Sequence, residues 1–342
     1  MQLSMALMYA GDPRESADQV VALEKAGLDI VWIAEAYGYD SPTLMGYLAA
    51  RTETVKIGSA ILNVYSRTPA LLAQTAAGLD HVSGGRAILG IGASGPQVIE
   101  GWHGVPYEKP LTRTREIIDI VRRAIRREVI TNDGLIKLPL PEGEGTGLGK
   151  PLKLLNHPVR DTVPIYVASL GAKNVEMTAE LADGWLPFLY VPEKAKDVWG
   201  DALAAGTAKR SAELAPLEIS AGGMLAIGDD VRQTLDLARP VTALYIGGMG
   251  ARGKNFYFDL ACRYGYEAEA IKIQDLYLDG KKTEAAAAVP QELLELSNLV
   301  GPESYVRERI EAFRESGVTI LQVVPIDADP AGLVSKVKSW IG

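Results

Sequence analysis

The sequence has very few of the residues that build disulfide frameworks or metal sites. Its 342 residues include one cysteine, Cys262, and three histidines. A single cysteine excludes an intrachain disulfide, and three scattered histidines without a Cys or His partner at ligand spacing disfavour a zinc or haem site. We therefore expect a cytoplasmic protein, from a reducing compartment, that binds no metal.

Long hydrophobic runs and an excess of positive charge are also missing. No apolar stretch approaches the roughly 20 residues that span a bilayer, and residues 1–4 lack the basic and apolar regions of a signal peptide. With 35 basic and 43 acidic residues, the net charge is −8. This balance disfavours non-specific binding to nucleic acid or membranes, and we expect neither as a partner.

What the sequence does contain is a repeated junction in which an amphipathic helix ends at glycine and a strand rich in β-branched residues follows. It occurs at Gly27, Gly84, Gly184 and Gly317. Glycine just past the last turn is the common left-handed C-cap, so these junctions indicate alternating helices and strands. Strands are predicted near residues 2–8, 30–35, 55–63, 86–92, 163–169, 184–190, 217–226 and 319–325.

These strands are mostly continuous apolar runs, as residues 163–168 illustrate, which is typical of a parallel sheet buried on both faces. Eight such strands, without a division into two halves, favour an α/β fold of the (β/α)8 TIM-barrel type in a single domain over residues 1–342. Insertions are expected near residues 95–110, 128–160 and 250–290. We expect the second to extend over the barrel mouth and the third to form additional helices whose aromatic residues pack on the body.

One glycine motif suggests a dinucleotide site. Residues 90–95 read GIGASG, which matches the G-x-G-x-x-G pattern after an apolar run. In such sites the third glycine opens a helix at once, and an acidic residue about 20 positions further on ends the next strand. Two prolines and two glycines in residues 96–107 instead predict a long loop, and Glu116 falls within the helix that follows. We therefore reject this site and interpret the glycines as allowing close approach to the backbone.

The strand ends contain the candidate chemistry, because active sites of TIM barrels lie there. Glu35 ends a buried strand, where a carboxylate requires a partner. Residues 169–171 lead into a helix whose N-terminus, with Lys173, could bind phosphate; an ordinary strand-to-helix turn explains them equally well. His103 could donate a proton from the long loop, although a solvated or packing histidine is more common. Pro96 occupies the glycine position of a nucleophile elbow, which excludes that motif.

Four stretches together resemble the luciferase-like flavin and deazaflavin oxidoreductases. They are LDIVWIAEAY at 28–37, YSRTP at 65–69, GIGASGPQV at 90–98 and TRTRE at 112–116. Within that group the sequence is most similar to the coenzyme F420-dependent branch related to methylene-tetrahydromethanopterin reductase. The resemblance covers nearly the whole chain. It implies a TIM barrel with insertions, a homodimer, and coenzyme F420 at the carboxyl ends of the strands.

The resemblance also assigns residues by position. It implies a bulge with a non-prolyl cis peptide after the third strand, near Asn63 and Val64, that backs the cofactor ring. Glu35, Tyr37 and His103 become the candidate proton donors, with Glu35 first. The implied cofactor-binding residues are Asn63, Val64, Tyr65, Ser66, Gly92, Ala93, Ser94, Gly95, Ser169, Leu170, Gly171 and Lys173.

The reaction implied is hydride transfer between the deazaflavin and an unsaturated carbon of a small-molecule substrate. Relatives that act on alcohols or sugars carry an Asp-His pair where this chain has Glu35 and Ala36. That difference favours reduction of a C=C, C=N or C=O group. The alternatives are an FMN-dependent monooxygenase of the same family, which would use dioxygen, and a protein that binds the cofactor without turnover.

Overall fold

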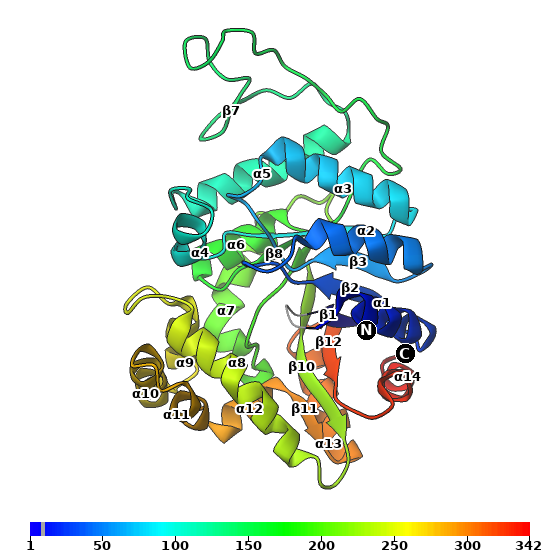
Figure 1. Ribbon diagram of the computed structural model, residues 1–342, viewed down its shortest axis with the longest axis vertical. Helices are drawn as coiled ribbons and strands as arrows, with labels where there is room; N and C mark the ends of the chain where they lie inside the picture. Colours follow the sequence, from blue (N-terminus) through cyan, green and yellow to red (C-terminus); the bar gives the residue numbers. More distant parts are fainter. Residues whose placement is uncertain (8–10) are drawn as a thin grey trace.

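The strands of the chain close into a parallel barrel surrounded by helices (Figure 1). The computed structural model describes residues 1–7 and 11–342. Each strand pairs in parallel with its neighbour, and the last pairs with the first. The predicted TIM barrel is therefore confirmed. Its strands are β1 (Gln2–Leu7), β2 (Ile30–Ile33), β3 (Lys56–Ser59), β5 (Ala87–Gly92), β8 (Ile165–Ala168), β9 (Gly184–Trp185), β10 (Glu218–Ile227) and β12 (Ile320–Pro325).

Several strands differ from their predicted bounds. The first was predicted to reach residue 8, which lies outside the described residues. The strand predicted at 184–190 ends after Trp185, because Pro187 cannot donate a ladder hydrogen bond. The strand predicted at 55–63 is interrupted, and its second part is β4 (Leu62–Asn63). A short strand, β11 (Leu299–Gly301), was missed because three residues are too few to show a periodicity.

The barrel helices begin where the sequence places capping residues. The side chains of Asp12, Asp40, Thr68 and Asp329 each accept a hydrogen bond from a first-turn N–H. Proline occupies the first or second position of these same four helices. The helices outside the barrel are α1 (Pro13–Lys25), α2 (Ser41–Arg51), α3 (Pro69–Ser83), α5 (Pro110–Ile125), α6 (Ala172–Leu181), α7 (Pro192–Thr207), α13 (Glu303–Glu315) and α14 (Pro330–Ile341).

The segment between β10 and β11 forms the additional helices that were predicted for residues 250–290. Tyr264, 3% exposed, donates its hydroxyl to the carbonyl of Leu189 and meets the Trp199 ring edge-on. These contacts confirm that aromatic residues of this segment pack on the barrel body, although Phe256 remains 46% exposed. The helices are α8 (Arg239–Ala243), α9 (Phe256–Arg263), α10 (Glu267–Leu278), α11 (Lys282–Ala287) and α12 (Gln291–Ser297), with a 3-10 turn at Arg232–Ala238 and a π turn at Leu244–Gly248.

Side chains fill the interior of the barrel. The ring centroids of Trp32 and Tyr166 lie 5.2 Å apart, and both side chains are buried. A Cβ atom at Gly58 would stand 2.3 Å from the Trp32 ring, and one at Gly184 would stand 2.1 Å from the Tyr166 ring. These two glycines therefore make room for the aromatic layer. Because the interior is packed, a ligand can bind only at the mouth of the barrel.

The prediction that residues 128–160 extend over the mouth is wrong. The segment projects beyond α5 on the outside of the barrel, as the chain around β7 shows at the top of Figure 1. It contains a small antiparallel hairpin of β6 (Asn132–Asp133) and β7 (Lys137–Leu138). The carboxylate of Glu116 in α5 accepts hydrogen bonds from the N–H groups of Leu135 and Ile136 at 2.7 and 2.8 Å. The hairpin docks on α5 because that carboxylate satisfies its backbone donors.

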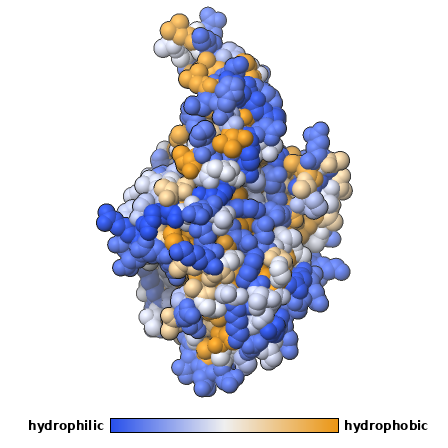
Figure 2. All heavy atoms as spheres, turned by 90° about the vertical axis from the view of Figure 1, so that its right-hand side faces the viewer, coloured by the Kyte–Doolittle hydropathy of each residue, from blue (hydrophilic) through white to orange (hydrophobic). Residues whose placement is uncertain are grey.

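Apolar side chains lie on the surface of the projecting segment, seen in orange at the top of Figure 2. At least half of each side chain is exposed in Leu140, Leu148, Leu152 and Leu155. The homodimer implied by the resemblance stays a prediction.

In the part of the chain that the structure describes, no helix is long and apolar enough to cross a membrane, and no three His, Cys, Asp or Glu side chains are grouped as metal ligands.

The Glu116 contact predicts a local effect of pH on the hairpin. Desolvation opposes ionisation, but the N–H donors of Ile136 and Leu135 and the Asn132 amide outweigh it and hold the pKa of Glu116 below its usual range. A lowered folded pKa means that the carboxylate stabilises the hairpin above its unfolded pKa, and that this stability is lost as the pH falls through the folded value. We expect Glu116→Gln to speed hydrogen exchange of the Leu135 and Ile136 amides at neutral pH.

Hydrogen exchange followed by NMR or mass spectrometry checks this expectation. Asp119→Asn is the matched control, since Asp119 lies in the same helix, is exposed, and pairs with Arg123 instead of the hairpin. Equal exchange in wild type and Glu116→Gln, at neutral pH, would show that the carboxylate does not hold the hairpin.

Candidate active site

Three predicted cofactor-binding segments leave adjacent strands at the same level of the barrel. Asn63 at the end of β4 pairs with Gly92 at the end of β5, and Gly92 pairs with Ala168 at the end of β8. The segments 63–66, 92–95 and 169–173 therefore start side by side at the carboxyl ends of their strands. This edge of the mouth is the place where a ligand could contact all three.

The bulge after β3 lies three residues earlier than predicted. The non-prolyl cis peptide is Ala60–Ile61, not Asn63–Val64. The Ser59 hydroxyl accepts from the N–H of Gly90 at 3.0 Å and donates to its carbonyl at 2.8 Å. Because this side chain takes both backbone groups of Gly90, direct pairing with β5 stops before Ser59 and resumes at Leu62, while the N–H of Ala60 still donates to the carbonyl of Ile33 in β2.

The glycines of the GIGASG motif accommodate this bulge. A Cβ atom at Gly90 would stand 1.7 Å from the carbonyl oxygen of Ser59, and one at Gly92 would stand 3.2 Å from the Ile61 side chain. A Cβ at Gly95 would meet nothing within 4 Å. Gly90 and Gly92 thus allow another part of the chain to approach, whereas the space at Gly95 is open to a ligand.

The loop predicted for residues 95–110 is wrong in part, because the short helix α4 (Pro96–Gly101) begins directly after Gly95. Proline is tolerated at the first helical position, so Pro96 is not evidence for a loop. One of the two reasons for rejecting a dinucleotide site is therefore lost. The other stands, since Glu116 is bound to the hairpin amides and does not lie at a strand end.

The Asn63 side chain holds the start of the 63–66 loop. Its Oδ1 accepts from the N–H groups of Tyr65 at 3.1 Å and Ser66 at 2.7 Å, and its Nδ2 lies 3.2 Å from Nε2 of His103. Val64 is fully buried and donates its N–H to the carbonyl of Gly92. The side chains of Asn63 and Val64 therefore shape the mouth from within the protein.

A pair of stacked tyrosines joins this loop to the segment after α4. The rings of Tyr65 and Tyr107 lie 5.1 Å apart at an angle of 28°, and the Arg113 guanidinium carbon lies 4.7 Å from the Tyr65 ring centre. Tyr65 donates to the carbonyl of Glu108, and Tyr107 donates to that of Ser94. Burial raises the pKa of Tyr107 to about 12, so its hydroxyl stays protonated and donates at neutral pH. Tyr107 and Arg113 were not predicted as site residues, because no sequence motif or spacing indicated that they would contact Tyr65.

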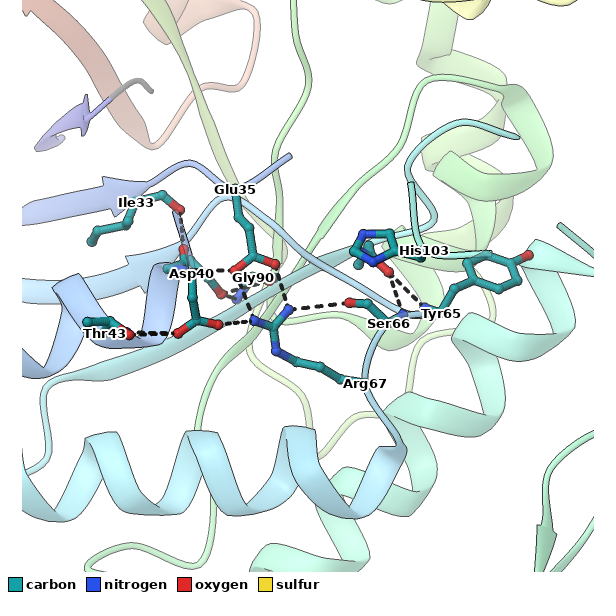
Figure 3. Close-up of polar contacts among 12 residues, drawn as sticks. Ile33, Glu35, Asp40, Thr43, Tyr65, Ser66, Arg67, Gly90 and His103 are labelled. Atoms are coloured by element: carbon teal, nitrogen blue, oxygen red, sulfur yellow. Dashed lines mark hydrogen bonds and ion pairs between the residues drawn. The ribbon is translucent and has the colours of Figure 1, made fainter. Parts of the chain in front are cut away.

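Glu35 has the partner that its position required, and the partner is Arg67. The guanidinium nitrogens of Arg67 contact both carboxylate oxygens of Glu35 at 2.6 and 2.9 Å, and the two side chains are 11% and 8% exposed (Figure 3). The N–H of Ser41 donates to the same carboxylate at 2.8 Å, and Arg67 also contacts Asp40 at 2.6 Å. With both oxygens accepting, the Glu35 side chain is suited to holding the 34–40 loop.

The other candidate proton donors differ in their surroundings. Tyr37 lies in the loop after β2 with 58% of its side chain exposed, and within the described residues no hydrogen bond joins it to this cluster. His103 contacts Asn63 and is half-buried. Arg67 was not among the predicted site residues, although it stands in the quoted stretch YSRTP; the buried carboxylate at Glu35 was the signal that could have found it.

Two tryptophans hold the third segment, which leads into α6. Trp185 donates its indole N–H to the carbonyl of Ser169 at 2.9 Å, and Trp199 donates to that of Leu170 at 2.8 Å. Gly171 is the N-cap of α6, without a side chain to cap it, and a Cβ there would meet nothing within 4 Å. The start of α6 therefore has no side-chain cap and has open space beside Gly171, and Lys173 is exposed two residues further on. This arrangement suits a phosphate group.

Comparisons with known proteins agree with this architecture. The protein named "Putative coenzyme F420-dependent oxidoreductase Rv3520c" from Mycobacterium tuberculosis is 42% identical over 96% of each chain. The 5,10-methylenetetrahydromethanopterin reductase of Archaeoglobus fulgidus is 30% identical over 90% of this chain and 88% of its own.

A solved structure shows the same fold over nearly the full length. It is the coenzyme F420-dependent tetrahydromethanopterin reductase from Methanopyrus kandleri, with a TM-score of 0.81, 21% identity, and coverage of 98% of this chain and 97% of that one. The family model for the luciferase-like monooxygenases matches residues 1–319. The chain therefore belongs to the luciferase-like monooxygenase family.

Proposed function

We propose that the protein is an oxidoreductase that binds coenzyme F420 and reduces an unsaturated bond of a small molecule. The main support for the proposal is that Asn63, Gly92 and Ala168 are paired in register at the carboxyl ends of three adjacent strands. There the open backbone at Gly95 and the uncapped start of α6 offer room for a flat ring and a binding place for a phosphate. The names of the two sequence relatives support F420 as the cofactor.

The residues at the mouth fit such a cofactor. The first-turn N–H groups of α6 and the Lys173 ammonium group would hold its phosphate. The backbone at Gly92, Ala93, Ser94 and Gly95 would line the ring or the chain attached to it, with the Ile61 side chain of the bulge beside Gly92. When bound, coenzyme F420 supplies a hydride from its deazaflavin ring.

The remaining side chains would orient the substrate. The wall formed by Tyr65, Tyr107 and His103 covers one side of the mouth, and the Glu35–Arg67 pair fixes the loop that carries Tyr37. A fixed wall of this kind places a substrate against the cofactor and so lowers the entropic part of the barrier. Ala36 stands where alcohol-oxidising relatives carry histidine, which supports reduction of C=C, C=N or C=O groups.

The second candidate is an FMN-dependent monooxygenase, favoured by the description of the family whose model matches. Equilibrium binding of oxidised F420 and of FMN to the purified protein, measured side by side by fluorescence quenching, separates the two. We expect selective binding of F420 in the micromolar range or tighter. Selective binding of FMN would move the protein to the monooxygenase group, and binding of neither would overturn the proposal.

A charge variant tests the phosphate position in the same assay. Lys173→Gln should weaken F420 binding several-fold, because one exposed ion pair contributes about 0.5–1 kcal/mol. Lys282→Gln in α11 is the control and should bind as the wild type does. Equal affinity in the two variants would show that Lys173 does not contact the cofactor.

A further inference from the structure

The hydrogen bonds of Asn63 decide which end of its amide faces His103. Two backbone N–H groups, those of Tyr65 and Ser66, point at the Oδ1 position at 3.1 and 2.7 Å. Only an oxygen can accept them, so the amide cannot be reversed. The atom 3.2 Å from Nε2 of His103 is therefore the NH2 nitrogen, which can only donate.

That orientation selects between the two tautomers of a neutral His103 ring. Its Nε2 must accept the hydrogen bond and so carries no proton, which leaves the proton of the neutral ring on Nδ1. A doubly protonated ring would place two donors against each other across the 3.2 Å contact. The backbone N–H of His103 donates to the carbonyl of Val98 within α4, which anchors the residue just after that helix.

We propose that His103 is held as the neutral Nδ1–H tautomer and that this N–H donates a hydrogen bond to the acceptor atom of the substrate, a carbonyl oxygen or imine nitrogen. The substrate half of the proposal rests on the proposed function. A neutral imidazole is a poor acid, so His103 polarises the acceptor atom, and the proton that completes the reduction comes from water. This role selects for unsaturated substrates with an oxygen or nitrogen at the reacting bond.

The tautomer can be measured without cofactor or substrate. In the full chain labelled with 15N-histidine, long-range proton–nitrogen NMR spectra distinguish Nδ1–H, Nε2–H and the doubly protonated ring. The chain has only three histidines, so His81→Gln and His157→Gln assign the signals. We expect His103 to show Nδ1–H alone at neutral pH. A mixture, Nε2–H or a doubly protonated ring would overturn the proposal.

One substitution should reverse the tautomer. Asn63→Asp keeps the size of the side chain and the oxygen that accepts from Tyr65 and Ser66, but it presents a second oxygen to His103. We expect the proton to appear on Nε2 in this variant. A spectrum still showing only Nδ1–H would mean that Asn63 does not control the ring.

Kinetics with reduced F420 and a carbonyl substrate test the substrate half. His103→Gln places an acceptor where Nε2 lies and keeps the contact with Asn63, but it lacks the Nδ1–H donor. We expect kcat to fall by about 10²-fold, as for loss of one donor to a developing negative charge, while F420 affinity changes less than about twofold. If His103 only holds the wall, His103→Gln would keep the wild-type kcat. Failure of wild type to bind F420 would instead overturn the proposed function and leave the tautomer result standing.

Discussion

Arg67→Met should lower the free energy of unfolding by about 3–5 kcal/mol, the usual cost of leaving one partner of a buried ion pair without its counter-charge. The Glu35 carboxylate would remain, 8% exposed, and among the described residues only the N–H of Ser41 would still donate to it. Urea denaturation of the two proteins at neutral pH measures the effect. We also expect weaker F420 binding, because the loop after β2 would lose its anchor to the loop after β4.

Two further variants show whether the cost comes from the unpaired charge. The double variant Glu35→Gln with Arg67→Met removes both charges and should recover most of the lost stability, since the amide oxygen can still accept from Ser41. Asp40→Asn removes the other carboxylate that Arg67 contacts, which is 53% exposed, and should cost less than about 1 kcal/mol. A double variant no more stable than Arg67→Met would contradict this account.

Gly90→Ala should destabilise the barrel by more than about 3 kcal/mol, above the usual cost of overpacking. The new methyl group would stand 1.7 Å from the carbonyl oxygen of Ser59. That oxygen cannot move away easily, because two hydrogen bonds tie the Ser59 hydroxyl to Gly90. Thermal unfolding followed by circular dichroism measures the loss of stability.

The same motif contains its own control. Gly95→Ala introduces the same methyl group at an ordinary extended conformation, φ −121°, with no atom within 4 Å. Its stability should stay within about 1 kcal/mol of the wild type. Similar losses in Gly90→Ala and Gly95→Ala would show that the approach of the bulge at Ser59 is not what requires glycine at position 90.

Much of the fold was predictable because its signals are local. The caps at Asp40 and Thr68 and the glycine ends of helices each depend on a few neighbouring residues. The position of the bulge was not predictable to the residue, because it depends on the Ser59 hydroxyl bonding to a strand about 30 positions further on. The path of residues 128–160 likewise depends on Glu116, whose hairpin donors lie 19 and 20 residues away.

The candidate site, like the fold, could be predicted only in part from the sequence. Glu35 could be singled out from the sequence, since a carboxylate at the end of a buried strand needs a partner, but the identity of that partner could not. Arg67 lies 32 residues further along the chain and reaches Glu35 only because their two strands are neighbours in the barrel. The sequence by itself determined the alternation of helices and strands, the helix caps and the small residues at the mouth, all of which follow from local backbone and burial preferences. Only the tertiary structure decided which side chains meet across the mouth and which tautomer His103 adopts, because those depend on the register between strands that the chain brings together from a distance.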